Sequence, residues 1–348
     1  MVIGGPVAQR ATSASSAYGV VLDLIEGLGR VPKGGTTTVD LPGAGHDRGL
    51  ELVGAWCASN GHEIVSVDGP SVTVRHGRSP DPFAGLDPRQ RPGFRVWVYT
   101  NFDCNLACDY CCVRSSPKAE RRAIGADRLH QIAREAAEAD VHELILTGGE
   151  PFLLNDIDEL ANSCTAHLPT TLLTNGMLFR GGRLERLRRM DASRLTLQVS
   201  VDSATADIHD SHRGTGSWAK AIAGIRVAHE EGFRVKVAAT LPADHKHELE
   251  PFHEFLDTLG IARDDQVIRA LAHRGVAESG IELTVESLIP EVTITADGVY
   301  WHPVAADHAD QFVTRDIFPL ADAIAEVTRR FVAHRRAADQ VAGWFPCA

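Results

Sequence analysis

The sequence predicts an α/β protein in which a small α+β domain precedes a larger parallel sheet. Two observations predict this. Residues 94–270 alternate between apolar strand-like runs and helical stretches, as a parallel sheet with helical crossovers requires. Residues 17–76 instead follow the order helix, strand, helix, strand, strand, and a proline-rich linker at 77–93 separates the two regions. We expect residues 1–16 to be disordered and residues 271–348 to form a C-terminal, substrate-covering region.

The small domain is expected to have two layers. Apolar residues at helical spacing, such as Leu24 and Leu28, predict its first helix, and period-two alternation predicts its last two strands. The expected helices are 17–31 and 48–60, and the expected strands are 36–41, 62–67 and 71–75. This order resembles the sulfur-carrier domain of the TusA type. The active Cys-Pro pair of that family is absent, and Cys57 is expected to be a small core residue. We therefore expect a degenerate carrier-like domain that serves as a docking module or as a structural cap.

The larger domain is expected to contain six β/α units. The expected strands lie near 94–100, 143–147, 170–174, 195–201, 233–240 and 266–270, and the expected helices lie near 127–139, 156–166, 182–190, 216–231 and 246–259. In β/α barrels the chemistry lies at the C-terminal ends of the strands. The polar motifs of this chain fall at those ends.

Composition and charge limit the partners. The net charge of −11 argues against nucleic acid, whose phosphates need a basic surface. No apolar stretch approaches the roughly 20 residues that span a bilayer. The first residues lack the basic and apolar regions of a signal peptide, so we expect a cytoplasmic protein without a membrane partner.

Three cysteines, Cys104, Cys108 and Cys111, follow the first strand of the larger domain in the spacing C-x3-C-x2-C. Three thiolates can hold three corners of a [4Fe–4S] cluster and leave the fourth iron open. A zinc site with Cys112 is an alternative, although adjacent cysteines rarely point at one metal. A disulfide is another, but the seven cysteines are odd in number and four of them crowd into nine residues.

The cysteine loop, from Phe102 to Cys111, resembles the cluster loop of the radical S-adenosylmethionine (SAM) enzymes. The run Thr147-Gly148-Gly149-Glu150-Pro151 resembles the GGEP motif of that family, and residues 209–216 resemble a stretch in its branch of molybdenum-cofactor, PQQ and peptide-modifying enzymes. The resemblance implies a partial (β/α)6 barrel of the TIM type, a [4Fe–4S] cluster and SAM. No cysteine pair follows residue 112, so an intact SPASM domain with a second cluster is not expected.

The resemblance also implies the SAM contacts. They are Tyr110 against adenine, Gly148, Gly149 and Glu150 at the ammonium, Asn175 near the site, Ser200 and Asp202 at the ribose or carboxylate, Arg213 at the carboxylate, and Val237 and Thr240 on the adenine side. Other interpretations stay open for several of them. Tyr110 could be ordinary loop packing, Asn175 could serve a turn, and Arg213 could lie in an exposed loop.

The function implied is reductive cleavage of SAM to a 5′-deoxyadenosyl radical that abstracts hydrogen from a substrate. We expect a small-molecule biosynthetic intermediate. One alternative is a peptide-modifying maturase whose N-terminal domain docks a precursor peptide, and another is a non-catalytic iron–sulfur or sulfur-relay protein. A flavodoxin- or ferredoxin-type reductant is expected. The candidate substrate residues are His273, Arg274 and His302, and the candidate hydrogen donors are Cys347 and Tyr300.

Overall fold

The computed structural model describes residues 9–10, 19–43, 45–79, 81–241 and 247–344. Cys347, the first candidate hydrogen donor, lies outside these residues. The chain divides into two compact units. Unit 1 comprises residues 1–85 and 330–348, and unit 2 comprises residues 86–329. No helix in the described ranges combines the length and the apolar character needed to cross a membrane.

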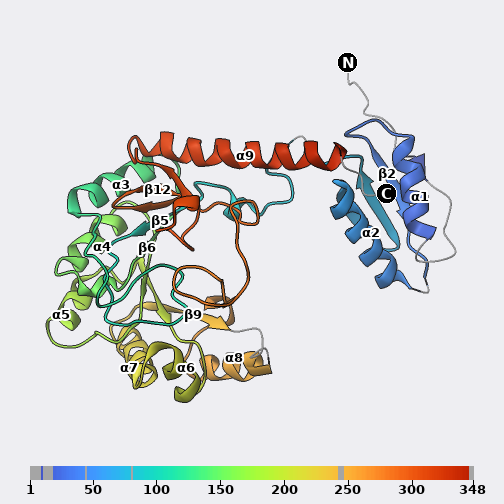
Figure 1. The fold of residues 1–348 in the computed structure, drawn as a ribbon. Helices are drawn as coiled ribbons and strands as arrows, with labels where there is room; N and C mark the ends of the chain where they lie inside the picture. Colours follow the sequence, from blue (N-terminus) through green and yellow to red (C-terminus); the bar gives the residue numbers. More distant parts are fainter. Residues whose placement is uncertain (1–8, 11–18, 44, 80, 242–246, 345–348) are drawn as a thin grey trace. The chain divides into compact units, whose positions relative to one another are not determined.

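Unit 1 is a four-stranded sheet with two helices (Figure 1). Its elements are β1 (Gln9–Arg10), α1 (Gly19–Gly29), β2 (Thr36–Asp40), α2 (His46–Asn60), β3 (Glu63–Asp68) and β4 (Ser71–Arg75). The strand order is β1-β2-β4-β3, with β1 parallel to β2 and the other pairs antiparallel. The sequence predicts disorder through residue 16, whereas Gln9 and Arg10 pair with β2.

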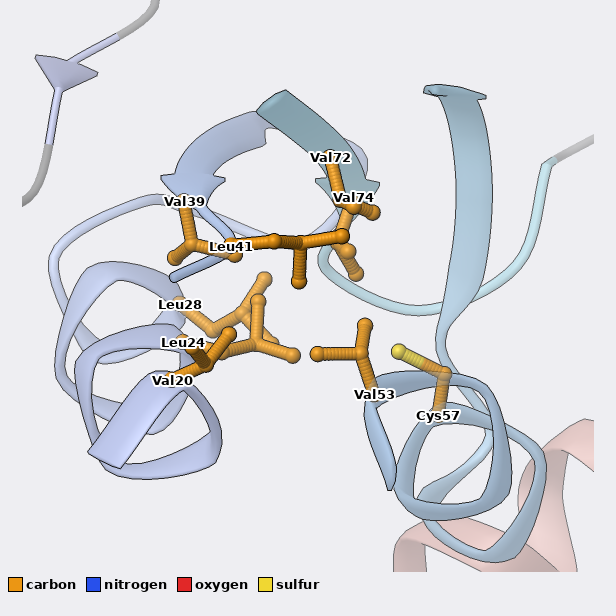
Figure 2. Packing of buried hydrophobic residues seen from close by; sticks show 9 residues of the cluster. All are labelled: Val20, Leu24, Leu28, Val39, Leu41, Val53, Cys57, Val72 and Val74. Carbon is orange, nitrogen blue, oxygen red and sulfur yellow. The ribbon is translucent and has the colours of Figure 1, made fainter. Parts of the chain in front are cut away.

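The core of unit 1 forms where α1 and α2 meet one face of the sheet, as Figure 2 shows. Every fourth residue of α1 (Val20, Leu24 and Leu28) is buried there, because positions four apart lie on one helix face. Cys57 of α2 is 2% exposed and packs into the same cluster, which confirms it as a core residue. Burial raises the pKa of this thiol to about 12, so it is protonated and inert at neutral pH.

Unit 2 is built on six parallel strands in the order β10-β9-β8-β7-β6-β5. Its elements are β5 (Arg95–Tyr99), α3 (Ala126–Glu138), β6 (Glu143–Thr147), α4 (Ile157–Thr165), β7 (Thr170–Thr174), α5 (Gly182–Arg189), β8 (Leu195–Ser200), α6 (Ala206–Arg213), α7 (Ser217–Glu230), β9 (Arg234–Leu241), α8 (Leu249–Thr258) and β10 (Gln266–Ala270). Each strand pairs with the next one in sequence, so the helices follow one another around the outside (Figure 1). This is the predicted partial barrel.

The C-terminal part extends the sheet beyond β5. It contains β11 (Thr293–Thr295), β12 (Gly298–Tyr300), β13 (Phe312–Thr314) and α9 (Leu320–Trp344). Strand β11 pairs in parallel with β5 and forms a hairpin with β12 about Asp297 and Gly298. Strands β11, β12 and β13 therefore continue the sheet on the side away from β10.

Candidate active site

The predicted cluster cysteines share one cavity at the C-terminal ends of the strands. The cavity measures about 200 Å³, and Cys104, Cys108 and Cys111 all line it; we refer to it as the cysteine cavity. Its other lining residues include the polar or small residues Tyr110, Gly148, Gly149, Asn175, Ser200, Arg213 and Thr240. These residues come from the C-terminal ends of β8 and β9 and from the segments that follow β5 to β8, which are far apart in the sequence.

The three thiols suit the three-corner ligation of a [4Fe–4S] cluster. Each of them is a free cysteine. Among the described residues, no three His, Cys, Asp or Glu side chains are arranged around a single metal ion. A four-iron cube needs no such arrangement, because each cysteine binds a different iron. Burial raises the pKa of Cys104 to about 12 and that of Cys108 to about 11, so iron binding must release these protons.

The glycine turn after β6 is pressed against the start of the cysteine loop. The backbone N–H groups of Gly149 and Glu150 donate to the carbonyls of Asn101 and Asp103, each at 3.0 Å. A Cβ on Gly149 would lie 2.5 Å from the carbonyl carbon of Asp103, closer than van der Waals contact allows. Much of the space beside these glycines is occupied by the backbone of the chain itself and not by a cavity. The glycines thus hold the cysteine loop in place as well as line the cavity.

Glu150 is fully buried and joins two neighbouring strand ends. Its Oε1 accepts hydrogen bonds from the Phe152 N–H at 3.0 Å and the Thr174 hydroxyl at 2.8 Å, and its Oε2 accepts one from the Asn175 N–H at 2.8 Å. Burial raises the pKa of Glu150, while these hydrogen bonds oppose the shift. Glu150 is not among the residues that line the cysteine cavity, so its observed contacts fit a positioning role. An ammonium contact stays a prediction.

A buried ion pair forms one wall of the cysteine cavity. Arg213 donates to Asp202 from Nε at 2.5 Å and from Nη2 at 3.2 Å, and Tyr110 also donates its hydroxyl to Asp202. Burial disfavours the Asp202 carboxylate, but the charge and hydrogen bonds of Arg213 outweigh it and lower the pKa of Asp202. Arg213 lines the cavity and Asp202 lies behind it. No described residue accepts a hydrogen bond from Nη1 of Arg213, which leaves this group for a ligand carboxylate.

Asp202→Asn should destabilise unit 2, because it leaves the buried Arg213 charge without its counter-ion. We expect the free energy of unfolding to fall by about 3 kcal/mol, a typical loss when one partner of a buried pair is removed. Urea unfolding at pH 7 measures this. Asp207→Asn, at an exposed position on the same loop–helix segment, should change stability by less than about 1 kcal/mol. Equal losses in the two variants would contradict a structural role for the pair.

The remaining predicted SAM contacts differ in their placement. Asn175 and Ser200 line the cysteine cavity, and the Asn175 amide also donates to Asn105 of the cysteine loop at 2.8 Å. Of the two residues expected on the adenine side, Val237 does not line the cavity: it is 1% exposed in the core, because successive residues of β9 point to opposite sides. Thr240, three positions further along, does line the cavity.

A second cavity, of about 350 Å³, occupies the interior of the barrel and is called the barrel cavity below. Its lining follows strand alternation: Arg95, Trp97 and Tyr99 from β5, Glu143, Ile145 and Thr147 from β6, Thr171 and Leu173 from β7, Gln198 from β8, Lys236 from β9, and Val267 and Arg269 from β10. Glu291 and residues 302–304 complete it from the C-terminal part. Cys112, Thr147 and Leu173 line both cavities, so the two adjoin one another.

The three candidate substrate residues separate into two groups. His302 lines the barrel cavity, and its Nδ1 accepts from the Val304 N–H at 3.1 Å, which leaves Nε2 as the protonated nitrogen. The predictions for His273 and Arg274 are not supported by their contacts, because both side chains are paired within surface loops. His273 pairs with Glu282, and Arg274 pairs with Asp310 at 2.9 Å. Neither lines the cysteine cavity or the barrel cavity.

Tyr300, the second candidate hydrogen donor, lies in a mainly apolar cluster. It is 7% exposed and packs with Tyr99, Phe102 and Val113. It is not among the lining residues of either cavity. Its position on β12, packed against Tyr99 of β5, fits a packing role, and hydrogen donation by Tyr300 stays a prediction.

His302 should make stability depend on pH. Burial, followed by the nearby charge of Arg269, lowers the pKa of His302 to about 4. Below about pH 6.5 the imidazole of His302 therefore binds a proton in the unfolded chain but stays neutral in the folded chain. The free energy of unfolding falls as the pH drops toward 4. Between pH 7 and pH 5, the free energy of unfolding should fall by roughly 1–2 kcal/mol more in wild type than in His302→Gln. Urea unfolding at both pH values measures this difference, and parallel losses would contradict the neutral, buried state of His302.

Sequence analysis missed several lining residues of the barrel cavity. Arg95, Lys236 and Arg269 lie inside predicted strands and resembled ordinary surface charges in the sequence. Arg95 and Lys236 each lie four residues before an inward-facing position of the same strand, Tyr99 and Thr240. Side chains an even number of residues apart on a strand point to the same side, and this spacing was the available signal. Cys112 was considered only as a metal ligand, whereas it borders both cavities.

Comparison with known proteins agrees with this site. Residues 98–259 match the profile of a family described as the radical SAM superfamily. An AdoMet-dependent heme synthase of Methanosarcina barkeri is 33% identical over 171 residues, which cover 49% of this chain and 48% of the relative. The mycofactocin maturase MftC of Mycobacterium ulcerans is 30% identical over 178 residues, which cover 51% of this chain and 46% of the relative. The chain thus spans about half the length of these curated relatives.

Structural comparison gives the same fold. The structure of native anSMEcpe with bound AdoMet and Kp18Cys peptide matches with a TM-score of 0.52 at 12% identity, over 69% of this chain and 82% of the other. At this identity the likeness concerns the fold alone.

Proposed function

We propose, on the premise that this chain belongs to the radical SAM superfamily, that it is an enzyme that cleaves SAM reductively and uses the resulting radical to abstract hydrogen from a substrate. One observation carries the proposal. The three cysteines, the glycine turn and Arg213 line one cavity, and this cavity adjoins a second cavity inside the barrel. A cofactor site next to a separate substrate space is what a radical transfer over a short distance needs.

The residues of this chain would position the two cofactors. Cys104, Cys108 and Cys111 would hold the cluster, and SAM would occupy the cavity between Tyr110 and Ser200. The Nη1 group of Arg213 would bind the SAM carboxylate while Asp202 fixes the guanidinium. Bound together, the cluster and SAM supply the 5′-deoxyadenosyl radical. The surrounding barrel keeps water away from it.

Anaerobic SAM cleavage tests the proposal. The protein is reconstituted with iron and sulfide, reduced with dithionite and supplied with SAM, and 5′-deoxyadenosine is measured by chromatography. We expect 5′-deoxyadenosine to form in proportion to protein. The protein could bind about four irons and still form no 5′-deoxyadenosine, even with a chemical reductant stronger than dithionite. This result would argue for the alternative of a non-catalytic iron–sulfur protein. In the cell, a flavodoxin- or ferredoxin-type protein of the cytoplasm would supply the electron.

An exposed edge strand in unit 1 supports a second, more specific role, in which unit 1 is a docking site for a peptide substrate. Strand β3 is an edge of its sheet, and Val65 and Val67 on this strand are each 44% exposed. An extended peptide can add to such an edge by main-chain hydrogen bonds. This role is tested with synthetic copies of short peptides that are encoded beside the gene. Their binding is measured to wild type and to Val67→Lys. Equal binding by both proteins would argue for a structural cap, the other role of a degenerate TusA-like domain.

A further inference from the structure

The barrel cavity holds cationic side chains that the fold itself does not use. Arg95, Lys236 and Arg269 reach it from β5, β9 and β10, which include both ends of the six-stranded parallel arc. Within the described residues, none of the three forms an ion pair or a side-chain hydrogen bond. The Nε of Arg95 is buried without a hydrogen-bond partner there. Because buried polar groups normally have partners, this donor indicates a ligand.

The acidic residues of the barrel cavity already have protein partners. Glu143 accepts a hydrogen bond from the Thr171 hydroxyl at 2.6 Å, and Glu291 accepts one from the indole N–H of Trp97. Three cations and two carboxylates thus face the cavity, so one added negative charge would balance them. His302 does not alter this balance at neutral pH, because it is uncharged.

The other walls of the cavity are apolar. Trp97, Ile145, Leu173 and Val267 lie between the charged positions. Such walls reduce the water around the partly buried Arg95 and Lys236, which strengthens their attraction for an anion, whereas Arg269 is exposed to solvent. Arginine also binds a carboxylate by two parallel hydrogen bonds. The cavity therefore combines a site for one carboxylate with room for an apolar body attached to it.

We propose that the barrel cavity binds the substrate through a carboxylate held by Arg95, Lys236 and Arg269, with its apolar part between Trp97 and Leu173. The substrate is thus an apolar monocarboxylic acid or a peptide that ends in an apolar residue with a free carboxylate. This inference rests on the proposed function, because it assigns the substrate of that reaction. Cys112 and Thr147, shared by both cavities, mark where the bound molecule would meet the radical.

Binding of matched acid and amide probes tests the inference. The reconstituted full-length protein is titrated calorimetrically with 3-phenylpropionate and with its neutral analogue 3-phenylpropionamide. We expect the acid to bind at least about tenfold more tightly, as a charge-assisted hydrogen bond requires. Acetyl-Gly-Gly-Phe and its C-terminal amide, tested in parallel, distinguish the sources of the carboxylate. Binding of the small acid alone indicates a small molecule, and preference for the free peptide acid indicates a peptide terminus.

Two variants test whether the acid probes bind in the barrel cavity. Lys236→Met keeps the length of the side chain and removes its charge, so the preference for acid over amide should fall about tenfold. Lys220→Met, on the exposed surface of α7, should leave the preference unchanged. Equal binding of acid and amide by wild type, or an unchanged preference in Lys236→Met, would overturn the inference.

The two proposals can fail separately. 5′-Deoxyadenosine formation is measured on the same preparation without probe. Acid preference without SAM cleavage would remove the proposed function and keep the anion site. SAM cleavage without acid preference would keep the function and remove the assigned substrate class.

Discussion

Cys104→Ala should reduce 5′-deoxyadenosine formation to the level of a protein-free sample. Removing groups that merely orient metal ligands costs about 10–100-fold, and removing a ligand itself should cost more. The thiol of Cys104 lines the cavity and lies on the loop held by the glycine turn, so no neighbouring cysteine can take its place without moving the backbone. Iron content, the visible absorption of the cluster and 5′-deoxyadenosine are measured together.

Two controls separate ligand loss from general damage. Cys57→Ala removes a thiol from the core of unit 1 and should leave iron content and SAM cleavage unchanged. Cys112→Ser changes the residue next to the motif and should keep the iron. If Cys112→Ser lost iron as Cys104→Ala does, a ligand set that includes Cys112 would replace the predicted three cysteines.

Gly149→Ala should strongly disturb the site. Its added Cβ would overlap the backbone of Asp103, and backbone atoms cannot swing aside as a flexible side chain can. We expect a loss of roughly 3 kcal/mol in the free energy of unfolding, at the upper end for overpacking, or displacement of the cysteine loop with a lower iron content. Thermal unfolding and iron analysis measure the two results.

The matched control is Gly182→Ala at the start of α5. A Cβ at Gly182 meets no atom within 4 Å, and alanine favours a helix, so stability should be unchanged or slightly higher. If Gly149→Ala folded and bound iron like Gly182→Ala, the glycine turn would not have the positioning role that its hydrogen bonds to Asn101 and Asp103 indicate.

The local motifs of the site could be predicted because each one lies at the end of a strand. Alternating strands and helices place strand ends at one edge of a sheet, so the order of motifs along the chain is enough to assign Cys104, Gly149 and Arg213 to one site. Glu150 shows the limit of this reasoning. The motif marks it as an acceptor, but only the fold shows that Phe152, Thr174 and Asn175 already donate to it.

The class of fold and the likeness to the radical SAM superfamily follow from residue type and from spacing along the chain, so the amino-acid sequence was sufficient for them. The role of the three cysteines as cluster ligands stays a prediction. Which charged residues face inward depends on the tertiary structure. Successive residues of a strand point to opposite sides, so Val237 packs in the core while its neighbour Lys236 reaches the barrel cavity. Tertiary contacts also pair His273 and Arg274 in surface loops while His302 enters the barrel. Strands distant in sequence set these positions, and no local pattern encodes them.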